Sequence, residues 1–97
     1  MDDRDERLLA VIRLVGAGEV VSYGDVAEDA GLPRHARRVG ALLAEATQPL
    51  PWWRVVNAAG RLVPGHEVEQ AGRLWAEGVT IVGDRVTRSP YGRFAKP

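Results

Sequence analysis

The chain has 97 residues, and its 13 basic and 13 acidic side chains give a formal net charge of zero at pH 7. This length suits one small domain, residues 1–97, and an apolar content of 45% argues against global disorder. With no cysteine and two histidines, the chain lacks disulfides, thiolate nucleophiles and the usual zinc ligands, so neither a metal nor a cofactor is expected. No apolar run approaches the roughly 20 residues of a membrane span, and the acidic N-terminus is unlike a secretory signal. We therefore expect a cytoplasmic protein, associated with the nucleoid in a bacterium.

The charges are unevenly distributed along the chain. Acidic residues crowd the first six positions, whereas the basic residues Arg34, Arg37 and Arg38 lie close together. A local basic face is therefore expected on a neutral molecule. Such a protein should bind non-specific DNA weakly, because phosphate neutralisation supplies most of that affinity.

The first half of the chain predicts three helices. Apolar residues recur with helical spacing over residues 4–15, and glycines follow. Ser22 with an acidic residue three positions later is typical of a helix start, so a short helix is expected from Tyr23 to about residue 30. A third helix is expected from Arg34 to about residue 46, with one apolar and one basic stripe. Two helices joined by a turn that contains glycine, the second with a basic outer face, indicate a helix-turn-helix.

The second half predicts short strands and one more helix. Residues 54–56 and 61–63 are expected to pair as a small hairpin across a four-residue turn. A helix is expected from Glu67 to about Glu77, and short strands follow at 79–82 and near Val86. The tail from about residue 89 is expected to be irregular. In the helix expected from Glu67 to about Glu77, the expected inward residues are Val68, Ala71, Leu74 and Trp75. The predicted fold class is mostly α with a small β-hairpin, a single winged helix-turn-helix-like domain.

Four short motifs occur in order along the chain. They read Val-Val-Ser-Tyr-Gly-Asp-Val-Ala from residue 20, Ala-Arg-Arg-Val-Gly from residue 36, Pro-Trp-Trp-Arg-Val-Val from residue 51, and a glycine at residue 60. Their order and spacing resemble the DNA-binding domain of the O6-alkylguanine-DNA alkyltransferase family, over residues from about 8 to 79. The resemblance implies a DNA-binding domain in which the helix that carries the second motif, from residue 36, lies in the minor groove of DNA.

Two tryptophans stand where that family keeps its reactive pair. In the enzymes, a Pro-Cys-His-Arg-Val motif supplies the alkyl-accepting cysteine and the histidine that activates it, and the matching residues here are Trp52 and Trp53. An indole nitrogen is a hydrogen-bond donor only, whereas alkyl acceptance needs an activated nucleophile beside a base. The sequence therefore predicts that the protein is not an enzyme. It resembles the alkyltransferase-like subfamily, in which tryptophan replaces the cysteine, although many of those proteins keep the histidine that this chain lacks.

The resemblance implies a non-enzymatic DNA-lesion sensor that binds O6-alkylguanine in duplex DNA, flips it and flags it for nucleotide excision repair. Arg37 is the expected finger that replaces the flipped nucleotide, because a planar guanidinium can stack between bases. Tyr23 is expected to crowd the phosphate and help to rotate the nucleotide out, and Arg54 is expected to be structural. The expected DNA-binding residues are Ser22, Tyr23, Arg34, Ala36, Arg37, Arg38 and Gly40. The expected lining of the flipped-base pocket is Pro51, Trp52, Trp53, Val55 and Arg61, with Arg61 or His66 as a candidate basic lid.

Two other classes of function remain open at this point. A winged-helix, sequence-specific transcription regulator would prefer one DNA sequence and would usually dimerise, but no dimerisation helix is evident. A cryptic enzyme would need a nucleophile or base near Trp52, and residues 48–64 contain no Asp, Glu, Cys or His. Glu67 and Glu69 lie beyond this stretch and could fold back toward it. The expected partners are double-stranded DNA containing O6-alkylguanine and nucleotide excision repair proteins, with no membrane and a monomeric state.

Overall fold

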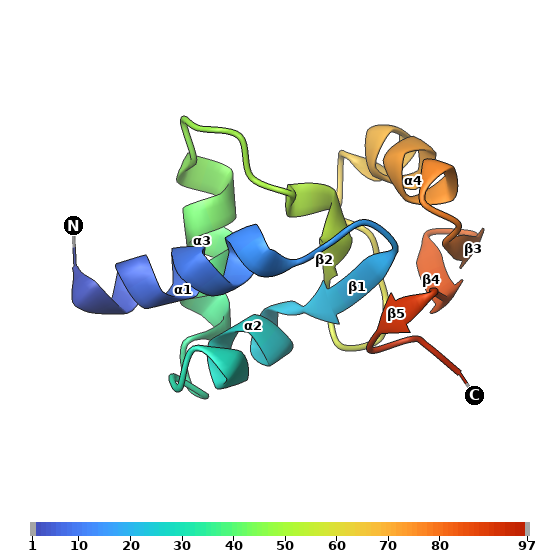
Figure 1. The fold of residues 1–97 in the computed structure, drawn as a ribbon. Helices are drawn as coiled ribbons and strands as arrows, with labels where there is room; N and C mark the ends of the chain where they lie inside the picture. The colour runs from blue at the N-terminus through green and yellow to red at the C-terminus, as the bar shows by residue number, and fades with distance from the viewer. Residues whose placement is uncertain (1, 97) are drawn as a thin grey trace.

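The computed structural model describes residues 2–96, in which helices lie around a small central sheet and a second, two-stranded sheet lies at the edge (Figure 1). The elements, in chain order, are α1 (Asp3–Leu14), β1 (Glu19–Ser22), α2 (Tyr23–Asp29), α3 (Ala36–Glu45), the 3-10 turn η1 (Trp52–Arg54), β2 (Val55–Val56), α4 (Glu67–Ala76), β3 (Thr80–Val82), β4 (Arg85–Arg88) and β5 (Tyr91–Gly92). None of the helices within residues 2–96 is long and apolar enough to cross a bilayer.

The helix starts follow the local capping chemistry. The Ser22 hydroxyl accepts a hydrogen bond from the Asp25 backbone N–H at 3.0 Å, and the Asp25 carboxylate accepts one from the Ser22 N–H at 2.9 Å. This reciprocal capping box confirms the start of α2 at Tyr23. α3 begins at Ala36 rather than at Arg34, because the His35 N–H donates to the Leu32 carbonyl and keeps the preceding residues in a turn.

The central sheet has the order β2-β1-β5, and both outer strands run parallel to β1. The expected hairpin between 54–56 and 61–63 is therefore wrong. Val55 and Val56 are both completely buried. Pairing of β2 with β1 places the two side chains in the apolar cores on opposite sides of the sheet. The segment that follows lies against the end of β4 instead, where the Leu62 N–H donates to the Asp84 carbonyl at 2.8 Å. The antiparallel hairpin of this fold is β3–β4.

The C-terminal segment is also more ordered than expected. Within the tail expected to be irregular from about residue 89, β5 pairs with β1, and the Tyr91 and Arg93 N–H groups donate to the carbonyls of Gly18 and Val20. The last residue of that tail lies outside the described range. β2 pairs with only one edge of β1. β5 pairs with the other edge, whose backbone groups would otherwise have no hydrogen-bond partner.

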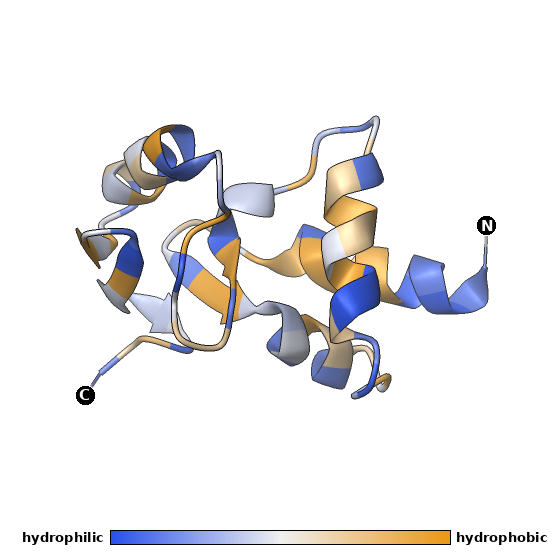
Figure 2. Ribbon diagram, turned by 180° about the vertical axis from the view of Figure 1, so that it is seen from behind, coloured by the Kyte–Doolittle hydropathy of each residue, from blue (hydrophilic) through white to orange (hydrophobic). Residues whose placement is uncertain are grey.

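Two apolar cores lie on opposite sides of the central sheet, because successive side chains of a strand point to opposite faces. Val21 and Val55 join the first core with α1, α2 and α3, whereas Val20 and Val56 join the second core with α4, β3 and β4. Figure 1 shows α1, α2 and α3 on one side of β1 and α4 with the β3–β4 hairpin on the other. In Figure 2, seen from behind, α3 lies in front of α1, and the loop between β2 and α4 lies on the same side.

α4 is rotated relative to the sequence prediction. Ala71 and Leu74 are buried as expected, but Val68 is 91% exposed and Trp75 is 60% exposed, so both expectations are wrong. A polar residue takes the vacated core position. The completely buried amide of Gln70 donates to the carbonyls of Trp53 and Val55 and accepts from the Val63 N–H at 2.7 Å. These backbone groups need a partner away from water, and the rotation of α4 supplies one.

Candidate nucleic-acid interface

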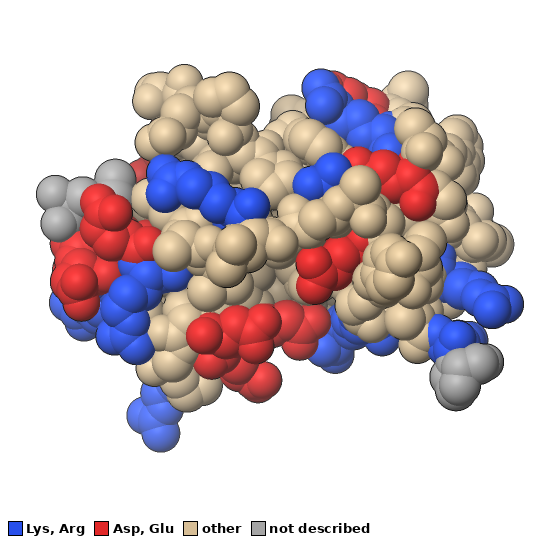
Figure 3. Space-filling model, viewed as in Figure 1, with Lys and Arg blue, Asp and Glu red and all other residues tan. Residues whose placement is uncertain are grey.

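One face of the molecule carries two groups of acidic side chains (Figure 3). On the face that α1 crosses, acidic side chains gather over the start of α1 and over α2 (Figure 3), which disfavours contact with a polyanion. The exposed acids of these two helices include Asp3, Glu6, Glu28 and Asp29. α3 lies on the opposite side (Figure 2), and the arginines predicted to meet DNA lie in the turn before it (Arg34) and in its first turn (Arg37 and Arg38).

The arginines around the start of α3 have different surroundings. Arg34 and Arg37 are exposed, whereas Arg38 donates from Nε and Nη2 to the two carboxylate oxygens of Asp5 at 2.9 and 2.8 Å. This bidentate pair holds the pKa of Asp5 below its usual value, chiefly through the hydrogen bond from Arg38. Arg38 also lies 3.6 Å from Glu45. Arg38 therefore ties α3 to α1, whereas Arg34, just before α3, and Arg37, in its first turn, are exposed to solvent.

Tyr23, Ser22, Ala36 and Gly40 lie where α2 meets α3. The Tyr23 ring is half-buried, and a Cβ atom built on Gly40 would lie 3.8 Å from it, in ordinary van der Waals contact. Burial raises the pKa of Tyr23, so its phenol remains a hydrogen-bond donor at neutral pH. The Ser22 hydroxyl is buried and engaged in the α2 cap, while Ala36 is partly buried at the first position of α3.

Trp52 is the side chain around which the site is built. It starts η1, is half-buried, and makes edge contacts with Trp53 and His66, whose ring centroids lie 6.4 and 5.8 Å away. On one side it faces a cavity of about 390 Å³, which we name the near cavity. The near cavity is lined by Tyr23, Gly40, Leu43, Trp52, Val63 and His66, among others. It is thus an opening between α3 and the segment that leads into α4, with aromatic rings on both sides.

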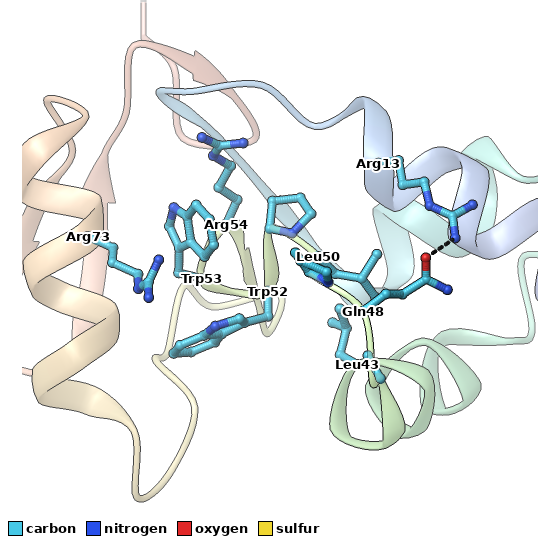
Figure 4. Close-up of a pocket in the computed structure, with 11 residues that line it drawn as sticks. Arg13, Leu43, Gln48, Leu50, Trp52, Trp53, Arg54 and Arg73 are labelled. Atoms are coloured by element: carbon cyan, nitrogen blue, oxygen red, sulfur yellow. Dashed lines mark hydrogen bonds between the residues drawn. The ribbon is translucent and has the colours of Figure 1, made fainter.

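A second cavity, the far cavity, has a volume of about 530 Å³ and shares Trp52 and Leu43 with the near cavity. Figure 4 shows Trp52 and Trp53 in its middle, with Arg73 reaching toward them from α4. On the other side Arg13 of α1 donates to Gln48 at 3.3 Å.

Trp53 is held in a network that fixes the site to α4. Its indole N–H donates to Glu77 at 3.0 Å, and the guanidiniums of Arg54 and Arg73 both lie over its ring, 4.9 and 4.6 Å from the centroid. Arg54 donates to both Glu77 oxygens and to the Val15 carbonyl at 2.9 Å, so the prediction that Arg54 is structural is confirmed. The Arg54 hydrogen bonds, with smaller contributions from the Gly18 N–H and Trp53, lower the pKa of Glu77 to about 2.

The predicted pocket residues separate into three groups. Trp52 lines both cavities, and Pro51 and Trp53 line the far cavity. Val55, in contrast, is completely buried in the core, where a base could not reach it, because β2 pairs with β1. Arg61 is exposed, and its backbone forms an isolated antiparallel β-bridge with Arg85 at the start of β4.

Two residues of α4 that line the cavities are not among the predicted pocket residues, although the sequence leaves open that Glu69 folds back toward Trp52. Glu69 lines the near cavity and Arg73 lines the far cavity, and the two are ion-paired at 3.0 Å. Together with His66 they follow the spacing i, i+3, i+7, which places them on one stripe of a helix. The sequence therefore shows that these three side chains share one face of the helix. Only the observed rotation of α4 shows that this face points at the cavities.

Comparisons with known proteins agree with this geometry. Residues 3–79 match the family described as 6-O-methylguanine DNA methyltransferase, DNA binding domain. The chain is 40% identical to a DNA base-flipping protein of Escherichia coli (strain K12), which covers 84% of this chain and 67% of that protein. It is 36% identical to a DNA base-flipping protein of Vibrio parahaemolyticus, over 84% of this chain and 85% of that one.

Solved structures show the same likeness. A structure of the Schizosaccharomyces pombe protein ATL in complex with DNA has a TM-score of 0.78 at 29% identity and covers 100% of this chain and 98% of its own. A structure of S. pombe Atl1 in complex with damaged DNA containing O6-carboxymethylguanine has a TM-score of 0.75 at 31% identity, over 84% of this chain and 82% of that one. The predicted winged helix-turn-helix-like fold class is thereby confirmed. The chain has no cysteine, so it has no thiol to accept an alkyl group. The chain belongs to the 6-O-methylguanine DNA methyltransferase DNA-binding domain family, as an alkyltransferase-like member.

Proposed function

We propose that the protein binds O6-alkylguanine in duplex DNA, takes the altered base out of the helix into the near cavity, and leaves the alkyl group in place. The observation that carries this proposal is a cavity of about 390 Å³ between Tyr23, at the start of α2, and Trp52. Its volume lies within the roughly 300–1,000 Å³ of small-ligand sites. An enzyme or sensor that reads the O6 position must reach it outside the base stack.

The two aromatic residues suit a flipped base. Bases stack on aromatic rings with about 1–3 kcal/mol each, and Trp52 offers such a ring at the cavity wall. The protonated Tyr23 phenol can donate to a phosphate or to a base acceptor. Alkylation of O6 adds an apolar group and removes the N1 proton of guanine, so a largely apolar wall favours the lesion over guanine.

The exposed arginines supply the DNA contacts. Arg37 is the proposed finger, since it projects from the first turn of α3, and Arg34 is a proposed phosphate contact beside it. The small residues Ala36 and Gly40 allow α3 to approach the duplex closely. Arg38 stabilises the orientation of α3 through Asp5, so its proposed contribution to DNA binding is indirect. Ser22 contributes through the α2 cap in the same indirect way.

A protein that leaves the lesion in place aids repair only when another protein removes it. We therefore extend the proposal to nucleotide excision repair as the pathway that receives the marked site. Loss of this protein should then sensitise cells to alkylating agents while excision repair is intact, and should add nothing in cells that lack excision repair. Added sensitivity in excision-deficient cells would contradict this extension.

The flipping step can be tested with a fluorescent cytosine analogue placed opposite O6-methylguanine in a short duplex. Removal of the lesion from the stack unpairs the analogue, so the protein should raise its fluorescence with the lesion duplex and leave the guanine duplex nearly unchanged. Gly40→Val should abolish the rise, because the added side chain projects at the Tyr23 ring beside the near cavity.

Gly72→Val is the matched control. Gly72 lies within α4 with nothing within 4 Å of a built Cβ, so the same substitution is made in a helix but away from the cavity. It should leave the fluorescence rise intact. A lesion duplex that binds without any fluorescence change, or equal losses in the two variants, would contradict the flipping proposal.

A further inference from the structure

A groove of about 230 Å³ opens between the end of α1 and the outer side of α2, and the proposed function makes no use of it. We name it the α1–α2 groove. Its lining residues come from these two helices and from β1, and they are Val11, Leu14, Val15, Glu19, Val21, Val26 and Asp29. None of them lines the near cavity or the far cavity. The groove is therefore a separate feature of the surface.

Leu14 is the apolar residue that the fold leaves uncovered at this groove. It is 83% exposed at the last position of α1, whereas Val15, Val21 and Val26 are buried. Val11 and Leu14 are three positions apart, so they share one face of α1. An uncovered leucine beside an apolar floor gives a second apolar side chain a place to leave water.

Carboxylates border the groove. A second hollow shares Glu19, Val21 and Asp29 with it, and the charged residues that line the two together are Glu19, Asp25, Glu28, Asp29 and Arg93. Arg93 and Asp25 pair with each other at 2.9 Å. The other three acids form no ion pair within residues 2–96, and we name them the acidic rim. Acidic side chains over α2 are visible in Figure 3, and they give this surface a negative potential.

This combination selects the kind of occupant. A nucleic acid and an anionic lipid surface are polyanions, so the acidic rim repels both. Addition of a strand is not available, because β2 and β5 occupy the two edges of β1. A helix with one apolar and one basic face fits, since its apolar side chains enter the groove while its cations meet the carboxylates.

We propose that the α1–α2 groove and its acidic rim dock a basic amphipathic helix of a partner protein. A leucine-like side chain of that helix packs beside Leu14, and its lysines or arginines face Glu28 and Asp29. A base held in the near cavity leaves this groove free, because the two share no lining residue. The inference goes beyond the proposed function and does not depend on base flipping.

The test uses three fluorescein-labelled peptides and the full chain. The first has leucines at the helical spacing i, i+3, i+4, i+7 with lysines between them, the second has the same composition in scrambled order, and the third has glutamate in place of lysine. In fluorescence anisotropy at low ionic strength, the protein should bind the first about fivefold more tightly than the second, from partial burial of one leucine. The third should bind most weakly, because the acidic rim repels it.

Leu14→Ser tests the apolar contact. It should weaken binding of the first peptide about fivefold, because it removes the uncovered leucine from the groove. Val68→Ser is the matched control, since Val68 is 91% exposed on α4, which contributes no residue to the groove. It should leave the affinity unchanged. Both positions are exposed, so neither variant should change the melting temperature.

The double variant Glu28→Gln/Asp29→Asn tests the acidic rim. It should weaken binding of the first peptide about fivefold, within the range of two exposed ion pairs. Asp3→Asn/Glu6→Gln removes the same charge from exposed positions at the start of α1, away from the groove, and should leave the affinity nearly unchanged.

The results that would overturn the proposal are defined. Equal affinity for the patterned and scrambled peptides, no effect of Leu14→Ser, or equal losses in the two double variants would each leave only a non-specific negative surface. Analytical ultracentrifugation tests the remaining occupant, a second copy of this chain. Self-association of the unmodified protein that Leu14→Ser abolishes would assign the groove to that second copy and overturn the proposal of a partner helix.

Discussion

Glu77 is the residue whose substitution tests the structural account of the site most sharply. Its carboxylate accepts hydrogen bonds from the Trp53 indole, from Arg54 and from the Gly18 N–H, and its side chain is only 14% exposed. Glu77→Gln keeps the shape and removes the charge. Arg54 then remains largely buried with a neutral partner, which is costly for a guanidinium.

The pKa of Glu77 gives the size of the effect. It is about 2 in the folded protein against an ordinary value of 4.5, and this difference corresponds to an upper bound of about 3 kcal/mol. Glutamine retains part of the hydrogen bonding, so we expect Glu77→Gln to lower the free energy of unfolding by about 2 kcal/mol at pH 7. Because the folded pKa is depressed, this stabilisation is complete above about pH 4.5 and is lost as pH falls toward 2.

The assay is urea unfolding followed by circular dichroism, at several pH values between 7 and 2.5. The unmodified protein should lose stability as pH falls below about 4.5, and Glu77→Gln should show a shallower acid limb. Glu28→Gln, at an exposed position of α2, is the control. It should change neither the free energy of unfolding at pH 7 nor its decrease in acid. A loss below about 0.5 kcal/mol in Glu77→Gln at pH 7, which is the range of ordinary surface substitutions, would refute the reasoning.

Four further substitutions have defined outcomes. Arg37→Ala should weaken binding to lesion DNA with no loss of thermal stability, whereas Arg38→Ala should lower the melting temperature because it releases Asp5; the opposite pattern would reverse the two roles. Trp52→Cys alone should accept no alkyl group, since the histidine partner is also replaced, and mass spectrometry of the protein after incubation with lesion DNA would reveal any transfer. Gln70→Leu should destabilise the fold by about 2–4 kcal/mol in urea titrations, because it leaves buried backbone groups unpaired, and a neutral result would contradict the account of α4.

The sequence predicts best the features that depend on neighbouring residues. The capping pair of Ser22 and Asp25 marks the start of α2 because the two residues, three positions apart, bond to each other's backbone. The loss of the reactive pair is likewise legible, since no geometry makes a nucleophile of the indoles of Trp52 and Trp53. The absence of cysteine from the chain likewise shows, without any structure, that no thiol can accept an alkyl group.

The errors arise where distant residues decide. Val55 and Val56 form too short a strand to show a period, so their parallel pairing with β1 depends on a segment about thirty residues earlier. The rotation of α4 is set by the Gln70 amide, whose backbone partners come from other segments, and this turns Val68 outward against its hydrophobicity. Arg38 belongs by sequence with Arg34 and Arg37, but Asp5 of α1, 33 residues away, engages it.

The measurement that bears most directly on the central claim is fluorescence anisotropy with two matched duplexes, one containing O6-methylguanine and one containing guanine, at fixed salt. We predict at least tenfold tighter binding of the lesion, about 1.4 kcal/mol, with the adduct recovered unchanged from the complex. Equal affinity for the two duplexes would contradict the account and favour a winged-helix regulator that reads DNA sequence, and disappearance of the adduct would contradict the claim that the protein carries out no transfer.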